Sequence, residues 1–279
     1  IKKNSNRLEI LSSERISDEI NKILMSQTPS NGFRNLEKLN LLNHILPELI
    51  DLKGVEEVEG QTHKDSFYHT LEVVDNISRN TENVWLRWAA LLHDVGKAPT
   101  KKFSKKIGWT FHGHEFIGSK MVKKIFTRLS LPLNEKLKYV QKIVMMSSRP
   151  IIISEDIVTD SAVRRLIYDA GDDIDDLLTL CEADITTKNM KKSLIYQNNF
   201  KIVRQKIKDV EERDSIRNFQ PPITGEIIMA YFNIKPCKEI GLIKEKIKNA
   251  ILDGEIRNDY KEAHDLMVKT GKSLGLKDE

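Results

Sequence analysis

The sequence of 279 residues predicts an all-α fold, and three observations support this prediction. Hydrophobic residues make up 39% of the chain and charged residues 31%, a mixture that favours amphipathic helices over sheets. Apolar residues recur at intervals of three and four along most of the chain, which is the helical period. No segment shows the convincing alternation of apolar and polar residues that is typical of a strand, so no strand is predicted.

The first predicted helix begins after Ser12 and Ser13, which are good N-cap residues, and its apolar side chains keep the helical spacing. A turn-rich segment over 26–32 follows, and a second helical pattern of apolar residues then covers 33–47. The acidic segment 54–60, with a glycine at each end, interrupts this pattern and marks a domain boundary.

Helical patterns also cover most of the remaining chain. Pro221, Pro222 and Gly225 open a C-terminal region whose apolar residues again follow the helical period. The further predicted helices span 64–79, 83–95, 113–129, 134–147, 160–170, 173–186, 224–231, 240–252 and 258–270.

The charge of the chain is unevenly distributed. The overall net charge of +4 is too small to indicate nucleic-acid binding by itself. Residues 97–149 contain 13 Lys and Arg against two acids, a net charge of +11, whereas residues 151–186 carry ten acids against two Arg, a net charge of −8. Both segments are compatible with solvated helix faces, and equally with a basic surface for phosphates beside an acidic, cation-holding region.

The cysteine content and the hydropathy indicate a cytoplasmic protein without a membrane span. Cys181 and Cys237 cannot form a disulfide framework, which points to a reducing compartment. No apolar segment approaches the roughly 20 residues that a membrane-spanning helix needs. The sequence begins at Ile1 without a signal peptide, and we expect it to be a piece of a longer chain.

Five of the seven histidines lie within 52 residues, which is a reason to look for a metal site. His93 and Asp94 are adjacent near the predicted end of a helix, where the negative end of the helix dipole favours a cation. Gly96 is expected to stop this helix, with Pro99 just beyond it. A single His-Asp pair also occurs by chance in many chains, so further ligands are needed.

His69 and Asp184 supply these further ligands. His69 lies one helical turn before Val73 and can face the core, and Asp184 lies at the edge of an apolar stripe that includes Leu177. A carboxylate directed at a core is unfavourable unless it is paired or binds a metal. His69, His93, Asp94 and Asp184 together form a mixed nitrogen and oxygen site that suits Mn, Ni, Fe, Zn or Mg.

One divalent ion at such a site would lower the pKa of bound water and polarise a phosphoryl oxygen. Asp94 and Lys97 are the candidate catalytic residues, with Lys97 placed to neutralise a phosphate as a point charge. The alternative for Lys97, an exposed lysine in a basic segment, is equally compatible with the sequence.

The order and spacing of His69, His93-Asp94 and Asp184 resemble the HD superfamily of metal-dependent phosphohydrolases. The phrases LLHDVGKAPTKKF (91–103) and FHGHEFIGSKMV (111–122) are similar to the HD region of bacterial tRNA nucleotidyltransferases and poly(A) polymerases. RLEILSSERISDEINKIL and GFRNLEKLNLLNHILPEL resemble the helical RNA-binding neck of that family, and the segment 223–256 resembles its C-terminal part.

This resemblance implies three parts: a neck-like RNA-binding region over 1–55, an HD domain over 56–200 and a helical tail over 201–279. It implies a metal-dependent phosphohydrolase that acts on cyclic nucleotides or on phosphates at RNA ends, with tRNA or another RNA as partner. The family's polymerising head is not found in the sequence, so nucleotide addition is expected only of the full-length parent. The oligomeric state is open.

Two other functional classes remain. The HD fold can serve as a non-catalytic scaffold that helps a polymerising head to hold tRNA, and Ser147, where many relatives carry a histidine, keeps this alternative open. A stand-alone nucleotide phosphohydrolase is the third hypothesis, but it leaves the neck and the tail without a purpose. Candidates for a second metal or for substrate orientation are His114, Glu115 and His63, and candidates for phosphate contacts in RNA are Lys101, Lys102, Lys105 and Lys106.

Overall fold

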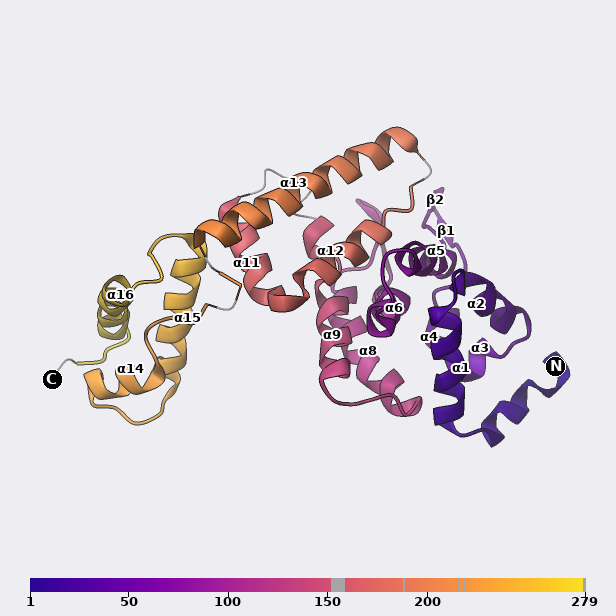
Figure 1. Cartoon of the computed structure of the whole chain (residues 1–279), viewed down its shortest axis with the longest axis horizontal. Helices are drawn as coiled ribbons and strands as arrows, with labels where there is room; N and C mark the ends of the chain where they lie inside the picture. Colours follow the sequence, from indigo (N-terminus) through magenta and orange to yellow (C-terminus); the bar gives the residue numbers. More distant parts are fainter. Residues whose placement is uncertain (152–158, 188, 215, 218, 278–279) are drawn as a thin grey trace. The chain divides into compact units, whose positions relative to one another are not determined.

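The computed structural model describes residues 1–151, 159–187, 189–214, 216–217 and 219–277 (Figure 1). The chain divides into two compact units, of which the first contains Ile1–Glu155 and Asp172–Lys201 and the second Asp156–Gly171 and Ile202–Glu279. Helices make up 69% of the structure, which confirms the predicted all-α fold. The three-part division at residues 55 and 200 stays a prediction.

The N-terminal part of the first unit consists of short helices. A 3₁₀ helix η1 (Lys2–Ile10) precedes α1 (Ser13–Met25), and Ser12 accepts a hydrogen bond from Arg15 N as its N-cap (3.4 Å). The predicted helical pattern over 33–47 is divided into α2 (Pro29–Lys38), α3 (Leu42–Ile45) and α4 (Pro47–Ile50). Asn40, with a φ of 59°, and Pro47 provide the physical reasons for these breaks.

Five longer helices build the core of the first unit. They are α5 (Ser66–Ser78), α6 (Val84–Leu92), α8 (His114–Arg128), α9 (Glu135–Met146) and α12 (Ile174–Ala183). The helix α6 packs against α5, α9 and α12, and α8 packs against α9. Phe67, Trp88 and Phe126 are fully buried between them. The observed ends of these helices lie within three residues of the predicted ends.

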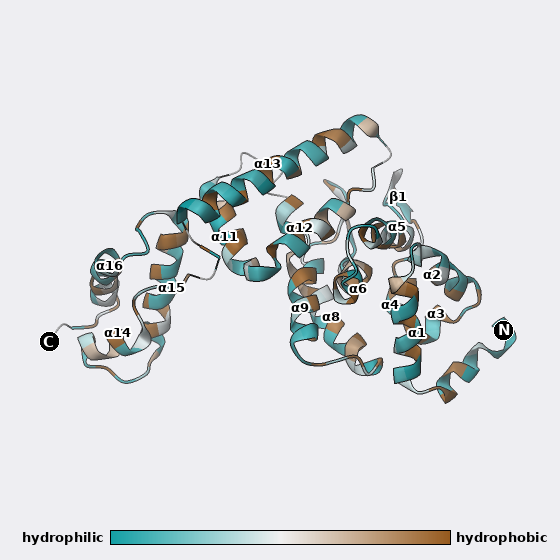
Figure 2. Cartoon of the chain, viewed as in Figure 1, coloured by the Kyte–Doolittle hydropathy of each residue, from teal (hydrophilic) through white to brown (hydrophobic). Residues whose placement is uncertain are grey.

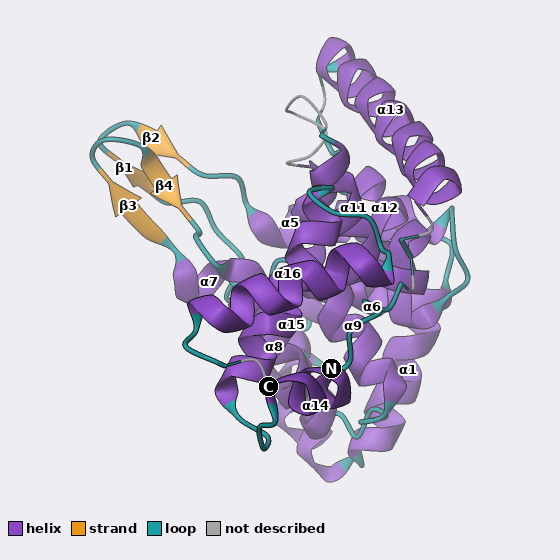
Figure 3. Ribbon diagram, turned by 90° about the vertical axis from the view of Figure 1, so that its left-hand side faces the viewer, coloured by secondary structure: helices purple, strands orange, loops and turns teal. Residues whose placement is uncertain are grey.

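Two hairpins correct the prediction that the chain has no strands. β1 (Glu57–Val58) pairs with β2 (Gln61–Thr62), and β3 (Lys102–Ser104) pairs with β4 (Gly108–Thr110), both antiparallel. The hairpins lie side by side (Figure 3), with β2 next to β4. Strands of two or three residues are too short to display an alternating pattern, which explains why the sequence did not reveal them.

The described part of the second unit consists of helices and connecting loops, with no strand. It contains α11 (Asp160–Ala170), α14 (Gly225–Phe232), α15 (Lys238–Asp253) and α16 (Tyr260–Ser273), all of which match predicted helices. The 25-residue helix α13 (Met190–Asp214), which begins in the first unit and ends in the second, was not predicted. Hydrophilic residues dominate it in Figure 2, so its apolar stripe is weak.

Arg87 joins the N-terminal helices to the core of the first unit. This buried guanidinium on α6 donates to the carbonyl oxygens of Leu24 (2.5 Å) and Ser26 (3.1 Å) at the end of α1. It also donates to Ser78 O (2.9 Å) at the end of α5 and, with two nitrogens, to Thr81 O. One side chain therefore satisfies backbone acceptors at the ends of two helices.

Among the helices that the structure describes, none combines the length and the hydropathy that a membrane crossing requires.

Candidate metal centre

Three helices of the first unit bring the predicted metal ligands together. His69 lies in the first turn of α5, which begins after Asp65, whose carboxylate accepts hydrogen bonds from Phe67 N and Tyr68 N. His93 caps the end of α6, and Asp184 caps the end of α12. Because α5, α6 and α12 pack against one another, side chains more than 100 residues apart in the sequence meet at one point.

The side chains form a compact cluster. His69 Nε2 lies 2.7 Å from Asp184 Oδ1, and His93 Nε2 lies 3.7 Å from the same oxygen. Asp94 adds its Oδ1 at 3.5 Å from His93 Nε2 and its Oδ2 at 3.8 Å from His69 Nε2. One ligand atom from each of His69, His93 and Asp184 lies within 4.8 Å of the others, which is close enough for one metal ion.

The hydrogen bonds of the imidazoles fit a metal. The Nδ1–H of His93 donates to Ala90 O (2.7 Å), and because a carbonyl can only accept, Nε2 is the nitrogen left for a ligand. Within the described residues, His93 Nε2 and Asp184 Oδ1 are buried and make no hydrogen bond of acceptable geometry. Buried polar atoms without a partner are costly, and coordination to a cation would satisfy both.

Electrostatic interactions in the cluster favour charged carboxylates. Burial alone would raise the pKa of Asp184, but His69 and His93 hold the pKa of this carboxyl well below its usual value. Burial likewise opposes a proton on His93, yet Asp94 and Asp184 raise its pKa to about 9. The two carboxylates therefore favour positive charge beside His93, which is the charge that a bound cation would supply.

Lys97 is not free, because its Nζ lies 2.7 Å from Asp94 Oδ2. The Asp94 side chain is 2% exposed and that of Lys97 is 24% exposed, so the ion pair reaches from the centre toward the solvent. Lys97 Nζ also lies 5.8 Å from the centre of the Phe111 ring. Asp94 thus lies near both candidate histidine ligands and also pairs through Oδ2 with the ammonium group of Lys97.

The remaining candidates lie at different distances from the cluster. His114 Nε2 lies 3.8 Å from Asp94 Oδ1. Glu115 contacts His114 rather than the cluster, with Oε2 3.4 Å from His114 Nδ1, and it accepts a hydrogen bond from Ser148 (2.5 Å). His63 packs against Trp109 in the hairpins and contacts backbone atoms with both ring nitrogens. The structure brings His114 to the cluster, and it places His63 in the hairpin region.

Ser147 lies buried at the end of α9. Its hydroxyl donates to Val144 O (3.0 Å), and its carbonyl accepts from the thiol of Cys181 (3.0 Å). These local contacts explain why a serine fits this position.

Lys64 and Thr186 were missed by the sequence analysis. Lys64 Nζ lies 2.9 Å from His69 Nδ1, and Thr186 Oγ1 lies 3.0 Å from the same nitrogen. Both residues border a cavity of about 550 Å³ that adjoins Asp184. The other residues lining it are Glu72, Ile151, Ile185, Thr187, Tyr196 and Phe200. No motif marks Lys64 or Thr186, and Tyr196 and Phe200 lie on α13, which was itself not predicted.

The four candidate lysines for phosphate contacts lie on or beside the β3–β4 hairpin (Figure 3). Lys101 pairs with Glu56 (2.6 Å), and Lys105 lies 3.5 Å from Glu59. Lys102 and Lys106 are exposed and form no ion pair within the described part of the chain. Acidic residues of one hairpin therefore offset part of the charge of the other.

Gly96 has a different role from the predicted helix stop. Its backbone is right-handed (φ −72°, ψ −12°), which any residue can adopt. A Cβ atom here would overlap the carbonyl oxygen of His114 and lie 2.7 Å from Gly118 N. The close approach of α8, which carries His114, is what requires a glycine.

Gly96→Ala is therefore expected to destabilise the first unit by about 1–3 kcal/mol, because α8 must move away from the extra methyl group. Urea denaturation followed by circular dichroism measures this change. Gly241→Ala, at a helix position with no atom within 4 Å of the new Cβ, is the matched control and should be neutral or stabilising. Equal stability of Gly96→Ala and the unmodified chain would contradict the argument.

Two family models match the chain. Residues 1–52 match the probable RNA- and SrmB-binding site of polymerase A, and residues 66–189 match the HD domain. All of the proposed ligands lie within the second match.

Curated relatives match over most of the chain. The chain is 28% identical over 254 residues to an A-adding tRNA nucleotidyltransferase of Deinococcus radiodurans. This match covers 90% of this chain and 57% of the relative. It is 27% identical to a CC-adding tRNA nucleotidyltransferase of Thermus thermophilus, covering 87% of this chain and 54% of the relative. A multifunctional CCA protein of Shewanella frigidimarina is 37% identical, but over only 46% of this chain and 31% of the relative. The chain thus spans little more than half the length of the first two relatives.

Proposed function

Because the chain belongs to the bacterial tRNA nucleotidyltransferase and poly(A) polymerase family, we propose that it combines RNA binding with metal-dependent phosphohydrolysis. The observation that carries this proposal is the cluster of His69, His93 and Asp184, in which His93 Nε2 and Asp184 Oδ1 are buried and make no hydrogen bond of acceptable geometry among the described residues. Such a donor set fits one divalent ion of the Mn, Ni, Fe, Zn or Mg type.

His69, His93, Asp94 and Asp184 would hold the ion in this proposal. The chemistry supplied by a divalent ion is Lewis-acid activation of water and of a phosphoryl group. Asp94 also orients Lys97 through their 2.7 Å ion pair, so that the ammonium group neutralises charge that develops on the phosphate or the leaving group. Thr186 Oγ1 lies 3.0 Å from His69 Nδ1, so that in the tautomer with the proton on Nδ1 the hydroxyl accepts it and Nε2 is left for the ion.

The substrate proposed for this centre is a nucleotide phosphoester, either a cyclic nucleotide or a phosphate at an RNA end. The cavity beside Asp184 supports this choice, because Tyr196 and Phe200 provide aromatic walls for a base. Lys64, which borders the same cavity next to His69, provides a cation for the phosphate. A phosphate without an organic group would leave these walls unused.

RNA is the proposed macromolecular partner. The region 1–52 would bind it, with phosphate contacts from Lys102 and Lys106 and, after release of their glutamates, from Lys101 and Lys105. Nucleotide addition, which the names of the relatives describe for those proteins, is proposed only for a longer parent protein. We retain a cytoplasmic location as a prediction.

The second candidate function is a non-catalytic scaffold for RNA binding. Ser147, which uses its hydroxyl for a local bond to Val144, is the observation that favours it, since the family resemblance places a histidine there in many relatives. In this case tRNA binding would survive the loss of all four proposed ligands and would weaken steeply with salt.

The deciding experiment measures metal content and hydrolysis together. Purified protein is expected to contain about one equivalent of a divalent ion and to hydrolyse 2′,3′-cyclic AMP in the presence of Mn²⁺ or Ni²⁺. Asp94→Ala is expected to lose both properties, because it removes a candidate ligand and the partner of Lys97. Wild-type protein without metal and without phosphodiesterase activity, but with salt-dependent tRNA binding, would instead support the scaffold.

A further inference from the structure

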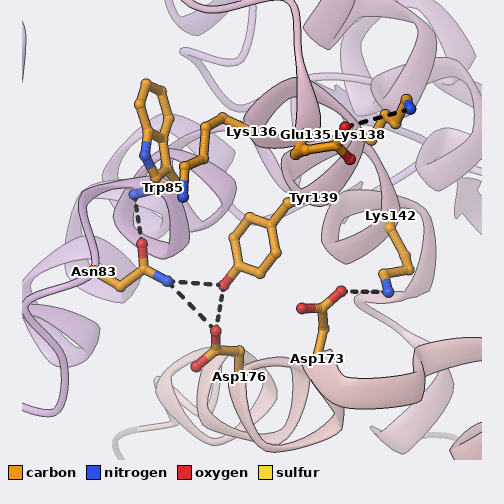
Figure 4. A pocket seen from close by; sticks show the side chains of 9 residues that line it. All are labelled: Asn83, Trp85, Glu135, Lys136, Lys138, Tyr139, Lys142, Asp173 and Asp176. Carbon is orange, nitrogen blue, oxygen red and sulfur yellow. Dashed lines mark hydrogen bonds and ion pairs between the residues drawn. The ribbon is translucent and has the colours of Figure 1, made fainter.

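A second cavity of about 630 Å³ lies at the opposite end of the helices that carry the metal ligands. Its lining residues come from the first turns of α6 and α12, from the first two turns of α9 and from the residues just before α6 and α12 (Figure 4). His93 and Asp184 directly follow the other ends of α6 and α12, which have nine and ten residues. At about 1.5 Å per residue, roughly 15 Å of helix separates the cavity from the metal centre. The two sites are therefore distinct.

The floor of this cavity is a preorganised polar network. Tyr139 donates its hydroxyl to Asp176 Oδ2 (2.6 Å), and Asn83 Nδ2 donates to Tyr139 Oη (3.3 Å) and to the same oxygen of Asp176 (3.5 Å). Burial raises the pKa of Tyr139 most, and the neighbouring Asp176 raises it further, so the phenol keeps its proton. Both bonds to Asp176 use Oδ2, and within the described chain Oδ1 is left to accept from a ligand hydroxyl.

The walls differ in character. Trp85 and Asn83 line one side in Figure 4, and the ion pair of Lys142 with Asp173 lines the other. The half-buried Trp85 ring lies 6.0 Å from the ring of Phe126, which holds it in place. An indole that is fixed in this way and also borders a cavity is a platform on which a base can stack.

Lys136 supplies the unpaired cation. Its side chain is exposed, and in the part of the chain that the structure describes it forms no ion pair. Lys138 lies 3.8 Å from Glu135 at the same rim. The cavity thus offers an aromatic platform, a hydroxyl acceptor and a free ammonium group within one space.

We propose that this cavity binds a ribonucleotide, with the base on Trp85, a ribose hydroxyl on Asp176 and the phosphate at Lys136. The volume falls in the range of about 300–1,000 Å³ that is usual for small-molecule sites. A small anion alone is disfavoured by the three carboxylates at the site, and a base alone would leave Lys136 without a role. The same chemistry is offered by a free mononucleotide and by a nucleotide within single-stranded RNA. The site needs neither a metal nor the HD chemistry, so it goes beyond the function proposed above.

Fluorescence titration in EDTA tests this site. In a Trp109→Phe background the emission comes from Trp85 and the buried Trp88, and AMP or a six-residue oligo(A) RNA serves as the probe. Saturable quenching is expected, and Lys136→Glu is expected to raise Kd at least about tenfold, because it reverses the charge at the phosphate. Lys191→Glu, the same change at an exposed lysine of α13, is the matched control and should leave Kd unchanged.

Trp85→Leu removes the fluorophore, so its Kd is measured by equilibrium dialysis with radiolabelled probes. This substitution should also raise Kd at least about tenfold, because it removes the stacking platform. A much tighter Kd for the RNA than for AMP identifies RNA as the source of the nucleotide, and similar Kd values identify the free mononucleotide. Absence of saturable binding, or Kd values that Lys136→Glu and Trp85→Leu leave unchanged in folded protein, would overturn the proposal. Because EDTA removes the metal, failure of the proposed hydrolase activity does not alter these outcomes.

Discussion

Replacing His93 with alanine is expected to reduce the affinity for a divalent metal by more than about 100-fold. Loss of a residue that only hydrogen-bonds to a metal ligand typically lowers metal affinity by about 10–100-fold, and loss of a ligand itself costs more. The reason is geometric: His93 Nε2 is buried, is aimed at Asp184 Oδ1 from 3.7 Å and has no hydrogen-bond partner within the described chain. Without this imidazole, His69 and Asp184 keep their 2.7 Å contact but form an incomplete donor set. Titration with Mn²⁺ or Ni²⁺, followed by calorimetry, measures the change.

His112→Ala is the matched control for this prediction. His112 is exposed and lies two residues before His114, so its removal takes away an imidazole near the centre without taking away a ligand. Metal affinity should therefore be unchanged in His112→Ala. If His93→Ala bound metal as tightly as the unmodified protein, the cluster of His69, His93 and Asp184 would not be the metal site.

Arg87→Met is expected to lower the free energy of unfolding of the first unit by about 3 kcal/mol or more. Methionine retains much of the apolar volume but leaves the carbonyl oxygens of Leu24, Ser26, Ser78 and Thr81 without their donor. The cost is large because the bond to Leu24 O is buried and the other bonds are partly buried, so that water replaces the buried guanidinium poorly. Urea denaturation gives the change in free energy.

Arg79→Met provides the comparison, because Arg79 is an exposed arginine at the end of α5 and should cost little when it is replaced. We expect α1 and the core helices to unfold in one transition, since Arg87 and the bond from Trp88 Nε1 to Asn21 (2.8 Å) connect them. An unfolding free energy of Arg87→Met equal to that of Arg79→Met would show that the carbonyl contacts contribute little to stability.

Local signals in the sequence were sufficient for most helices. Ser12 and Asn83 cap α1 and α6 as short polar side chains that accept backbone hydrogen bonds, and such caps act within three residues. The long helix α13 escaped prediction because its apolar stripe is weak, although Phe200, Val203, Ile207 and Val210 on it are buried in the folded chain. The two hairpins escaped because strands of two or three residues carry no period.

The candidate site was predicted in part. The sequence identified His69, His93, Asp94 and Asp184, because buried polar residues next to apolar stripes are unusual and because their order resembles the HD superfamily. Tertiary structure was needed for Lys64 and Thr186, which have ordinary neighbours in the sequence and meet His69 only in the folded chain.

The sequence by itself therefore determined the fold class, most helix boundaries and the four candidate ligands, which remain a prediction as ligands. Only the tertiary structure decided that Gly96 is needed for the approach of α8 and that Lys97 pairs with Asp94. It alone also placed one cavity at the start of α6, α9 and α12 and the other beside Asp184 at the end of α12. The physical reason is range: caps and periodicity act over a few neighbouring residues, whereas cavities, close approaches and ion pairs depend on distances between helices that the chain order does not encode locally.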